Sequence, residues 1–139
     1  MALDISTPVG RRIKQRLRTE QTIWLTTVDA HGVPQPRPVW FHWDGETLLI
    51  LSQPHAAKVR HIQRQASVAL NFNTDADGGD VGVLIGEAVI AAKPIAPNRL
   101  KAYLRKYRQG IKDIGLTPAS LQAEYSLAIL VTPLTTRGL

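Results

Sequence analysis

The stretch RPVWFHWDGETLLILSQPHAAKVRHI, residues 37–62, decides the fold of this 139-residue chain. Two runs rich in β-branched, aromatic and leucine residues flank the turn signal Asp44-Gly45, a pattern typical of a β-hairpin. Successive positions in both runs are apolar, so both faces of each strand should be apolar. This pattern predicts strands that are covered by other parts of the protein on both faces. We expect a small closed barrel that packs outward on a helix or a second subunit. A short helix is predicted over residues 56–65.

The rest of the chain predicts more strands, with helices at their joints. Thr7-Pro8 has the form of an N-cap followed by a first-turn proline, so a helix is expected over residues 7–19. Prolines at 34, 36 and 38 require an edge, a bulge or a bend in the second strand. Later strands are expected over residues 67–73, 81–92 with a bulge at Gly86, and 126–133. Further helices are expected over residues 97–111 and from Thr117-Pro118. The fold class is therefore mainly β with helices (α+β), in one domain spanning residues 1–139.

Composition narrows the function classes. The chain has no cysteine, which removes disulfides, thiolate nucleophiles and cysteine metal sites. No apolar run is long enough for a membrane helix, no secretory signal is evident, and a cytoplasmic location is expected. The four histidines lack metal-ligand spacing, and we find no hydrolase elbow, P-loop or dinucleotide fingerprint. No metal site is predicted, and no catalytic side chain is identified.

The basic residues raise the question of an anionic partner. The net charge is +6, and the basic residues concentrate in residues 11–18 and 99–112. We interpret both clusters as solvated helix faces, because the interleaved aromatics or helix-turn-helix of a nucleic-acid binder are missing. Ser52 at a strand end, Lys58 in the first turn of the next helix and Arg37 on the neighbouring strand could together bind a phosphate ester. An anionic small molecule is thus favoured, with neither nucleic acid nor membrane as a partner.

The run GVPQPRPVWFHWDGETLLILSQPHAAKVRHIQRQASVALNF, with GGDVGVLIGEAVI and YSLAILVTPLTTRG after it, resembles the pyridoxamine 5′-phosphate oxidase-like superfamily of split β-barrels. More narrowly, it is similar to the group of probable F420-dependent enzymes within that superfamily, through P-V-W-F-x-x-D-G, S-x-P-x-A-K-V-R and V-A-L. The resemblance implies a homodimer with the cofactor at the subunit interface. It implies that residues along the edge of the flavin or deazaflavin ring act largely through backbone groups, namely Arg37, Pro38, Val39 and Trp40. Ser52 and Lys58 would hold the phosphate, and Gln53 and Ala57 would shape the loop and helix start.

The chain also departs from the oxidase pattern. His42 and Ala57 stand where pyridoxamine oxidases carry basic residues, and the long C-terminal segment with its substrate-binding arginine is missing. The expected function is an oxidoreductase that uses F420 to reduce an unsaturated small molecule. The alternatives are an FMN-binding oxidoreductase of the same fold, and a cofactor carrier or sensor without turnover. The basic excess favours F420, whose oligoglutamate tail adds negative charge.

Overall fold

The strands of the computed structural model, which describes residues 6–138, form one antiparallel sheet in the order β2-β1-β5-β6-β7-β4-β3. Their bounds are β1 Ile23–Val28, β2 Pro34–Val39, β3 His42–Trp43, β4 Leu48–Ser52, β5 Ser67–Asn71, β6 Gly82–Ile90 and β7 Leu127–Gly138. The predicted strands are therefore confirmed, with β7 running longer and β5 and β6 shorter than expected, except that the second predicted strand is divided into β2 and β3. β2 lies at a sheet edge, which is where its prolines cost no ladder hydrogen bonds.

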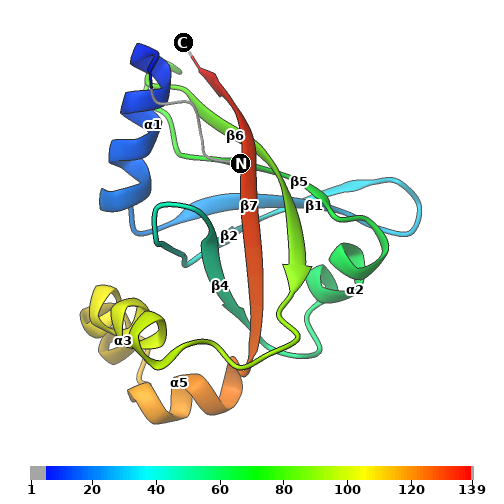
Figure 1. Cartoon of the computed structure of the whole chain (residues 1–139), viewed down its shortest axis with the longest axis vertical. Helices are drawn as coiled ribbons and strands as arrows, with labels where there is room; N and C mark the ends of the chain where they lie inside the picture. The colour runs from blue at the N-terminus through cyan, green and yellow to red at the C-terminus, as the bar shows by residue number, and fades with distance from the viewer. Residues whose placement is uncertain (1–5, 139) are drawn as a thin grey trace.

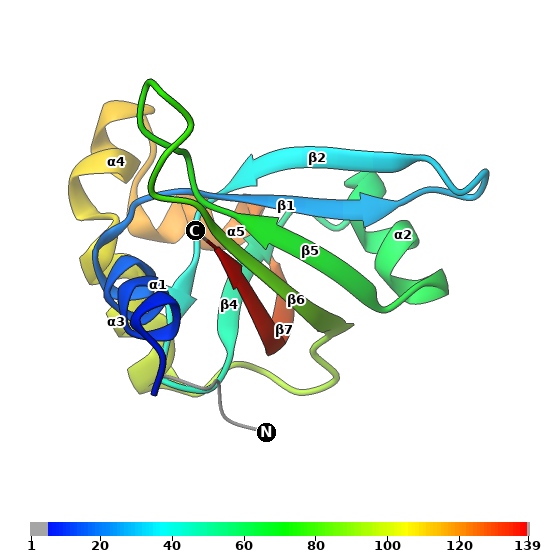
Figure 2. The ribbon, with the colours of Figure 1, turned by 90° about the horizontal axis from the view of Figure 1, so that it is seen from above.

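The sheet curls into a split barrel rather than a closed one. β2 and β3 are the two edges of the sheet, yet only Trp40 and Phe41 separate them in the chain, so the sheet must bend back on itself (Figures 1 and 2). The split β-barrel that the resemblance implies is confirmed, whereas the closed barrel expected from the apolar strands is wrong, because no ladder joins β2 to β3 in the described residues. At this corner the backbone N–H of Phe41 donates to the Tyr107 hydroxyl over 2.7 Å, and that hydroxyl also lies 2.8 Å from the Phe41 carbonyl. A side chain thus replaces the missing strand partner.

Five helices lie around the sheet within the described residues. They are α1 Pro8–Thr19, α2 Ala57–Arg64, α3 Pro97–Lys106, α4 Arg108–Asp113 and α5 Pro118–Glu124. Thr7 caps α1 and Thr117 caps α5 through their side chains, as the Thr-Pro pairs predict. The single helix expected over residues 97–111 is wrong, since Tyr107 divides it into α3 and α4.

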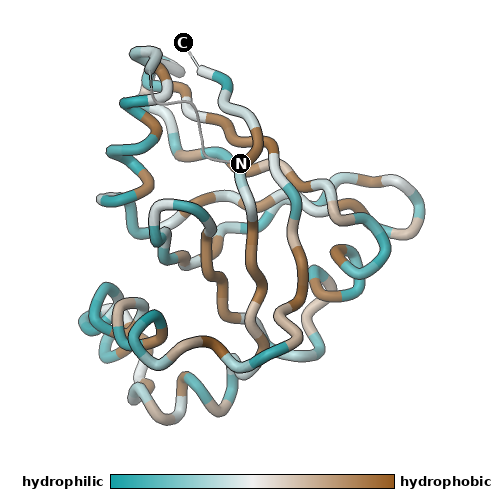
Figure 3. Tube along the Cα trace, in the orientation of Figure 1, coloured by the Kyte–Doolittle hydropathy of each residue, from teal (hydrophilic) through white to brown (hydrophobic). Residues whose placement is uncertain are grey.

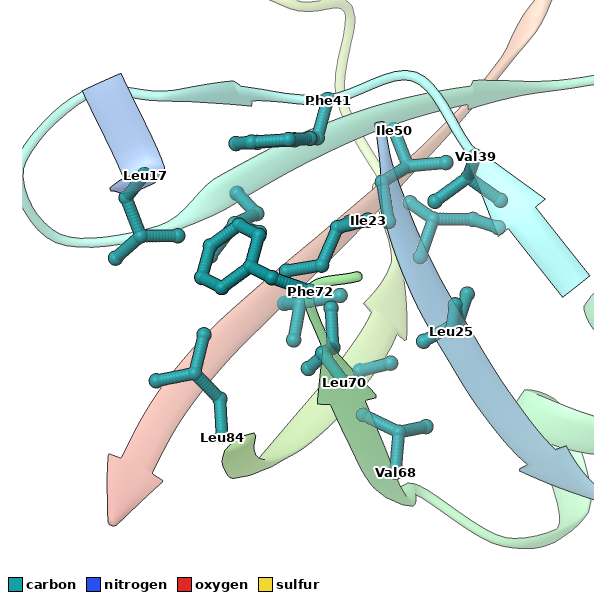
Figure 4. Packing of buried hydrophobic residues seen from close by; sticks show 14 of the residues in the cluster. Leu17, Ile23, Leu25, Val39, Phe41, Ile50, Val68, Leu70, Phe72 and Leu84 are labelled. Atoms are coloured by element: carbon teal, nitrogen blue, oxygen red, sulfur yellow. The ribbon is translucent and has the colours of Figure 1, made fainter. Parts of the chain in front are cut away.

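Apolar residues form two cores, one on each face of β4. Inside the curl, Leu48 and Ile50 join a cluster that includes Phe41 and Phe72, part of which Figure 4 displays. Outside it, Leu49 packs on residues of α3, α4 and α5. Figure 3 shows hydrophobic residues running along the central strands. The sequence predicted that a helix or a second subunit would cover the outer face of β4. In the structure, helices of the same chain cover it.

The outer face of β6 is different, because apolar side chains there stay exposed. Ile85 is 38% exposed and Val89 is 55% exposed. The bulge expected at Gly86 is confirmed by a register shift between Ile85 and Gly86. A Cβ at Gly86 would lie 2.5 Å from the Thr132 carbonyl oxygen, so only glycine fits this close approach of β6 and β7.

Candidate functional site

Two adjoining cavities lie where β2, β4 and the start of α2 meet. The smaller, which we call the cationic pocket, has a volume of about 290 Å³. It is lined by Thr27, Gln35, Arg37, Pro38, Ala56, Ala57, Lys58 and His61. The larger, which we call the aromatic pocket, has a volume of about 420 Å³ and shares Pro38, Ala56 and Lys58 with the first. One ligand could therefore extend through both.

Two cations without a carboxylate partner define the cationic pocket. Lys58 is half-buried and has no hydrogen-bond or ion-pair partner among residues 6–138. Burial, and then the positive charge of Arg37, lower the pKa of Lys58. Within residues 6–138, the guanidinium of Arg37 donates only to the neighbouring Pro36 carbonyl, at 2.8 Å. No acidic residue from the described part of the chain lines this pocket. A phosphate group would relieve the repulsion between the two cations and replace water lost by Lys58.

The start of α2 adds to the positive potential of this pocket. Its N-cap residue is Ala56, which makes no side-chain capping hydrogen bond, in contrast to Thr7 at α1. The first N–H groups of a helix have no partner within the helix, and they carry the positive end of its dipole. An anion in the cationic pocket would satisfy these donors together with Lys58.

His61 and Thr27 form a further polar edge of the cationic pocket. The Thr27 hydroxyl lies 2.8 Å from His61 Nδ1, which fixes the imidazole ring from the neighbouring strand. Thr27 is 2% exposed and sits on β1, which pairs with β2. Sequence reasoning missed both residues, as well as Gln35, because their approach to Lys58 depends on how β1, β2 and α2 pack.

The aromatic pocket has flat and apolar walls. Trp40, Tyr103 and Tyr125 line it, together with aliphatic residues such as Leu51. The Trp40 ring stacks on Tyr107 with centroids 4.5 Å apart and planes 2° from parallel. Gly110 permits α4 to approach the same indole, because a Cβ there would lie 3.2 Å from the ring atoms of Trp40. Trp40 is therefore held firmly, and the pocket suits a planar ring with a charged group at the Lys58 end.

The structure gathers most of the predicted site residues at these two cavities. Arg37, Ala57 and Lys58 line the cationic pocket, whereas Val39, Trp40 and Gln53 line the aromatic pocket, and Pro38 lines both.

Ser52 is the exception, since it lines neither of these two cavities. It is 1% exposed, and its hydroxyl donates to the Gln53 carbonyl at 2.9 Å. Alternation along β4 explains its position: Ser52 follows Leu48 and Ile50 at every second residue, and both of these are buried in the interior core.

Two other kinds of site were also considered. Within residues 6–138, no cluster of three or more histidine, aspartate or glutamate side chains is arranged to hold a metal ion. None of the helices in this part of the chain combines the length and the apolar character needed to cross a membrane.

Comparison with known proteins places this geometry in a wider context. The family model described as pyridoxamine 5′-phosphate oxidase matches residues 9–132. No curated protein matches the chain.

Solved structures resemble the chain along nearly its whole length. An F420 reductase is 27% identical, with a TM-score of 0.65, over 89% of this chain and 94% of that one. An FAD-binding protein from Mesorhizobium loti is 12% identical, with a TM-score of 0.69, over 91% of each chain. A heme storage protein from Vibrio cholerae is 16% identical, with a TM-score of 0.64, over 95% of each chain. The last two similarities show a shared fold alone.

Proposed function

This chain belongs to the pyridoxamine 5′-phosphate oxidase family, and from that premise we propose that it is an oxidoreductase that binds a phosphorylated flavin or deazaflavin. The observation that supports this most strongly is the pair Arg37 and Lys58, two cations that have no carboxylate partner among the described residues and lie beside the uncapped start of α2. Such a site fits a phosphate ester, and the adjoining aromatic pocket fits a planar ring. The substrate would be a small molecule.

Each residue of the site has a distinct role in this proposal. Lys58 and Arg37 bind the phosphate together with the first N–H groups of α2, and Ala57 leaves room for it. Pro38, Val39 and Trp40 border the ring, partly through the backbone of the edge strand β2.

Ser52 and Gln53 belong to the turn after β4. Ser52 acts indirectly, by fixing the Gln53 carbonyl. Gln53 borders the aromatic pocket, and its amide donates to Glu124 at 2.9 Å.

F420 is the cofactor that we favour, and FMN is the alternative. The similarity to an F420 reductase over most of both chains supports F420. The net charge of +6 also suits a cofactor with a longer anionic tail. The bound cofactor supplies the hydride chemistry, and the protein binds the phosphate, orients the ring against the Trp40 side of the pocket and limits water there.

The active form in this proposal is a homodimer with the cofactor at the subunit interface. Ile85 and Val89 expose apolar surface on the outer face of β6, which a second copy could cover. Sedimentation at micromolar concentration would check this. A stable monomer that still binds the cofactor would rule out a shared site.

Titration of the purified protein with F420 and with FMN tests the proposed function. We expect saturable binding of at least one cofactor, seen as a change in its absorbance or fluorescence, with inorganic phosphate as a weak competitor. Binding of F420 alone would support the favoured form, and binding of FMN alone the alternative. If neither cofactor binds, the proposal is wrong.

A further inference from the structure

Lys106, the last residue of α3, lies against the corner where the chain passes from β2 to β3. Its ammonium donates to the Phe41 carbonyl over 2.7 Å, and Nζ lies 3.6 Å from the centre of the Phe41 ring. The centre of the Tyr107 ring is 5.1 Å from the same nitrogen. Lys106 lines neither the cationic nor the aromatic pocket, and neither the sequence motifs nor the family resemblance assigns it a role. A half-buried cation is thus part of the corner itself.

The polar groups at this corner are fully paired only when Lys106 supplies a donor. The Tyr107 hydroxyl has a single hydrogen, yet two carbonyl oxygens lie within its reach, that of Gln21 at 2.7 Å and that of Phe41 at 2.8 Å. The same hydroxyl accepts the Phe41 N–H over 2.7 Å. Because Lys106 donates to the Phe41 carbonyl, the hydroxyl hydrogen is left for Gln21. One tyrosine hydroxyl therefore links the segment before β1 to the corner after β2.

Both segments that the Tyr107 hydroxyl links adjoin the aromatic pocket. Gln21 directly precedes Thr22, which lines this pocket. Phe41 directly follows Trp40, which lines the pocket as well and stacks on the Tyr107 ring. Without the lysine donor, the hydroxyl hydrogen could serve only one of the two carbonyls, and the other would be left without this partner. The position of Trp40 would then be less tightly fixed.

The positive charge of Lys106 does not itself stabilise the fold. The charged and titratable side chains of the surrounding elements are Arg16 on α1, Glu20 at its end, His42 on β3, Asp44 after it and Arg99 on α3. Both carboxylates already pair with an arginine, Glu20 at 2.8 Å and Asp44 at 3.3 Å. Burial lowers the pKa of Lys106 to about 8, and Glu20 opposes this shift only in part. Unfolding therefore takes up a proton between about pH 8 and the ordinary pKa of 10.5, so stability is lower while Lys106 is charged. What a lysine adds here, relative to an apolar residue, is the donor to Phe41.

We propose that Lys106 positions Trp40 in the wall of the aromatic pocket by completing the hydrogen bonds around the Tyr107 hydroxyl. Lys106 is thus a positioning residue of the cofactor site. The inference rests on the proposed function, which places the cofactor ring against Trp40. A wall that is ordered before the ring arrives lowers the entropy cost of binding. Loss of the Lys106 side chain should therefore weaken cofactor binding without unfolding the protein.

Lys106→Met, compared with Lys101→Met, tests the inference through cofactor affinity and stability. At pH 7, Lys106→Met should bind the cofactor about 3- to 10-fold more weakly. It should melt within about 3 °C of the wild type, because the lost hydrogen bond and the relieved cost of the buried charge oppose each other. Lys101 is exposed on the same helix and lines neither pocket, so Lys101→Met should bind within about twofold of the wild type. An equal loss of affinity in both variants, or a Lys106→Met protein that melts far below the wild type, would overturn the inference.

Fluorine NMR of the free protein labelled with 5-fluorotryptophan gives a second readout that does not depend on the cofactor. The chain has three tryptophans, and Trp40→Phe identifies the Trp40 signal. In the wild type this signal should shift with a midpoint at about pH 8, as Lys106 loses its proton. In Lys106→Met the shift should be absent, and motion of the indole should broaden the signal. Lys58→Ala should keep the shift, which separates Lys106 from the lysine that lines the aromatic pocket.

The outcomes distinguish this inference from the proposed function. A Trp40 signal that behaves alike in wild type and Lys106→Met would overturn the inference and leave the proposed function standing. If instead the signal follows Lys106 while neither F420 nor FMN binds the wild type, the proposed function is wrong.

Discussion

Arg16 on α1 is a paired cation, whereas Arg37 and Lys58 at the cationic pocket are cations without a carboxylate partner among the described residues. On α1, Arg16 donates to the carbonyls of Asp80 and Asn73 at 2.8 and 2.7 Å and to Glu20 at 2.9 Å. Its guanidinium also lies 4.7 Å from the centre of the Phe72 ring. At the cationic pocket, Lys58 has no such partner among the described residues, and its charged neighbour is Arg37, another cation.

The difference shows which positive charges are available to a ligand. The side chain of Arg16 is 12% exposed and ties α1 to the loop before β6, so the interpretation of this cluster as a solvated helix face is wrong for Arg16. Its charge is already compensated inside the protein. The charges of Arg37 and Lys58 are not, although these two residues contribute only a small part of the net charge of +6. Pairing, rather than total charge, locates the anion site.

The largest effect on cofactor affinity is expected when Arg37 and Lys58 are both replaced. Arg37→Ala/Lys58→Ala should weaken cofactor binding at least about 100-fold, because two charge-assisted contacts to the phosphate are lost, each contributing roughly 1.5 to 3 kcal/mol. The fold should survive, as circular dichroism can show. The matched control is Arg60→Ala/Arg64→Ala, which removes the same charge from exposed positions of α2. A control that loses as much affinity would mean that net charge explains the binding.

The next largest effect is expected on protein stability, when Arg16 is replaced. Arg16→Met should lower the free energy of unfolding by about 2 kcal/mol, because several hydrogen bonds and an aromatic contact are lost together. It should leave cofactor affinity within about twofold. Urea denaturation measures the first quantity, with Lys14→Met on the same helix as a control expected to change stability by less than about 0.5 kcal/mol. A large loss of cofactor affinity in Arg16→Met would remove the contrast between the two groups.

The pH dependence of binding sharpens the comparison further. Burial, followed by the charge of Arg37, lowers the pKa of Lys58 in the free protein, and a bound phosphate would raise it again. The affinity for the cofactor should therefore be highest at a pH below the pKa that Lys58 has in the free protein. It should fall several-fold as the pH rises through that pKa toward about 10.5. Titration from about pH 7.5 upward measures this fall. Lys58→Ala should abolish most of it, and an unchanged fall in that variant would assign the titration to another group.

The smallest effect comes from giving α2 the cap that α1 already has. Ala56→Ser would supply a hydroxyl to the first N–H groups of α2, and it should stabilise the protein by about 0.5 to 1 kcal/mol. The same hydroxyl would compete with the phosphate for those donors, so cofactor affinity should fall about two- to fivefold. Increased stability without any loss of affinity would show that the helix start does not bind the phosphate.

Local signals in the sequence predicted much of the fold. The Thr-Pro pairs located the starts of α1 and α5, Asp44-Gly45 located the turn before β4, and Gly86 located the bulge. The break between β2 and β3 was not predictable in this way. It depends on the Tyr107 hydroxyl, which reaches Phe41 from 66 residues further along the chain. The same tyrosine divides the helix that local periodicity predicted as continuous.

The candidate site was predictable only in part, for a similar reason. Arg37, Lys58 and their neighbours lie within one short stretch of sequence, so motif and resemblance could identify them. His61, Tyr103 and Tyr125 reach the pockets through packing, and nothing in their local sequence marks them. For Ser52, the motif predicts a contact with the phosphate, whereas the alternation of side chains along β4 places the residue in the protein interior.

Equilibrium titration of F420 and FMN, each into wild type, Lys58→Ala and Arg64→Ala, tests the central claim most directly. Lys58→Ala should bind the preferred cofactor about 10- to 150-fold more weakly, because one charge-assisted contact of roughly 1.5 to 3 kcal/mol is lost. Arg64→Ala should match the wild type within about twofold, because its guanidinium is exposed and lies 3.5 Å from the Val28 carbonyl, outside both pockets. Equal affinity of wild type and Lys58→Ala for both cofactors would contradict a phosphate site at the start of α2.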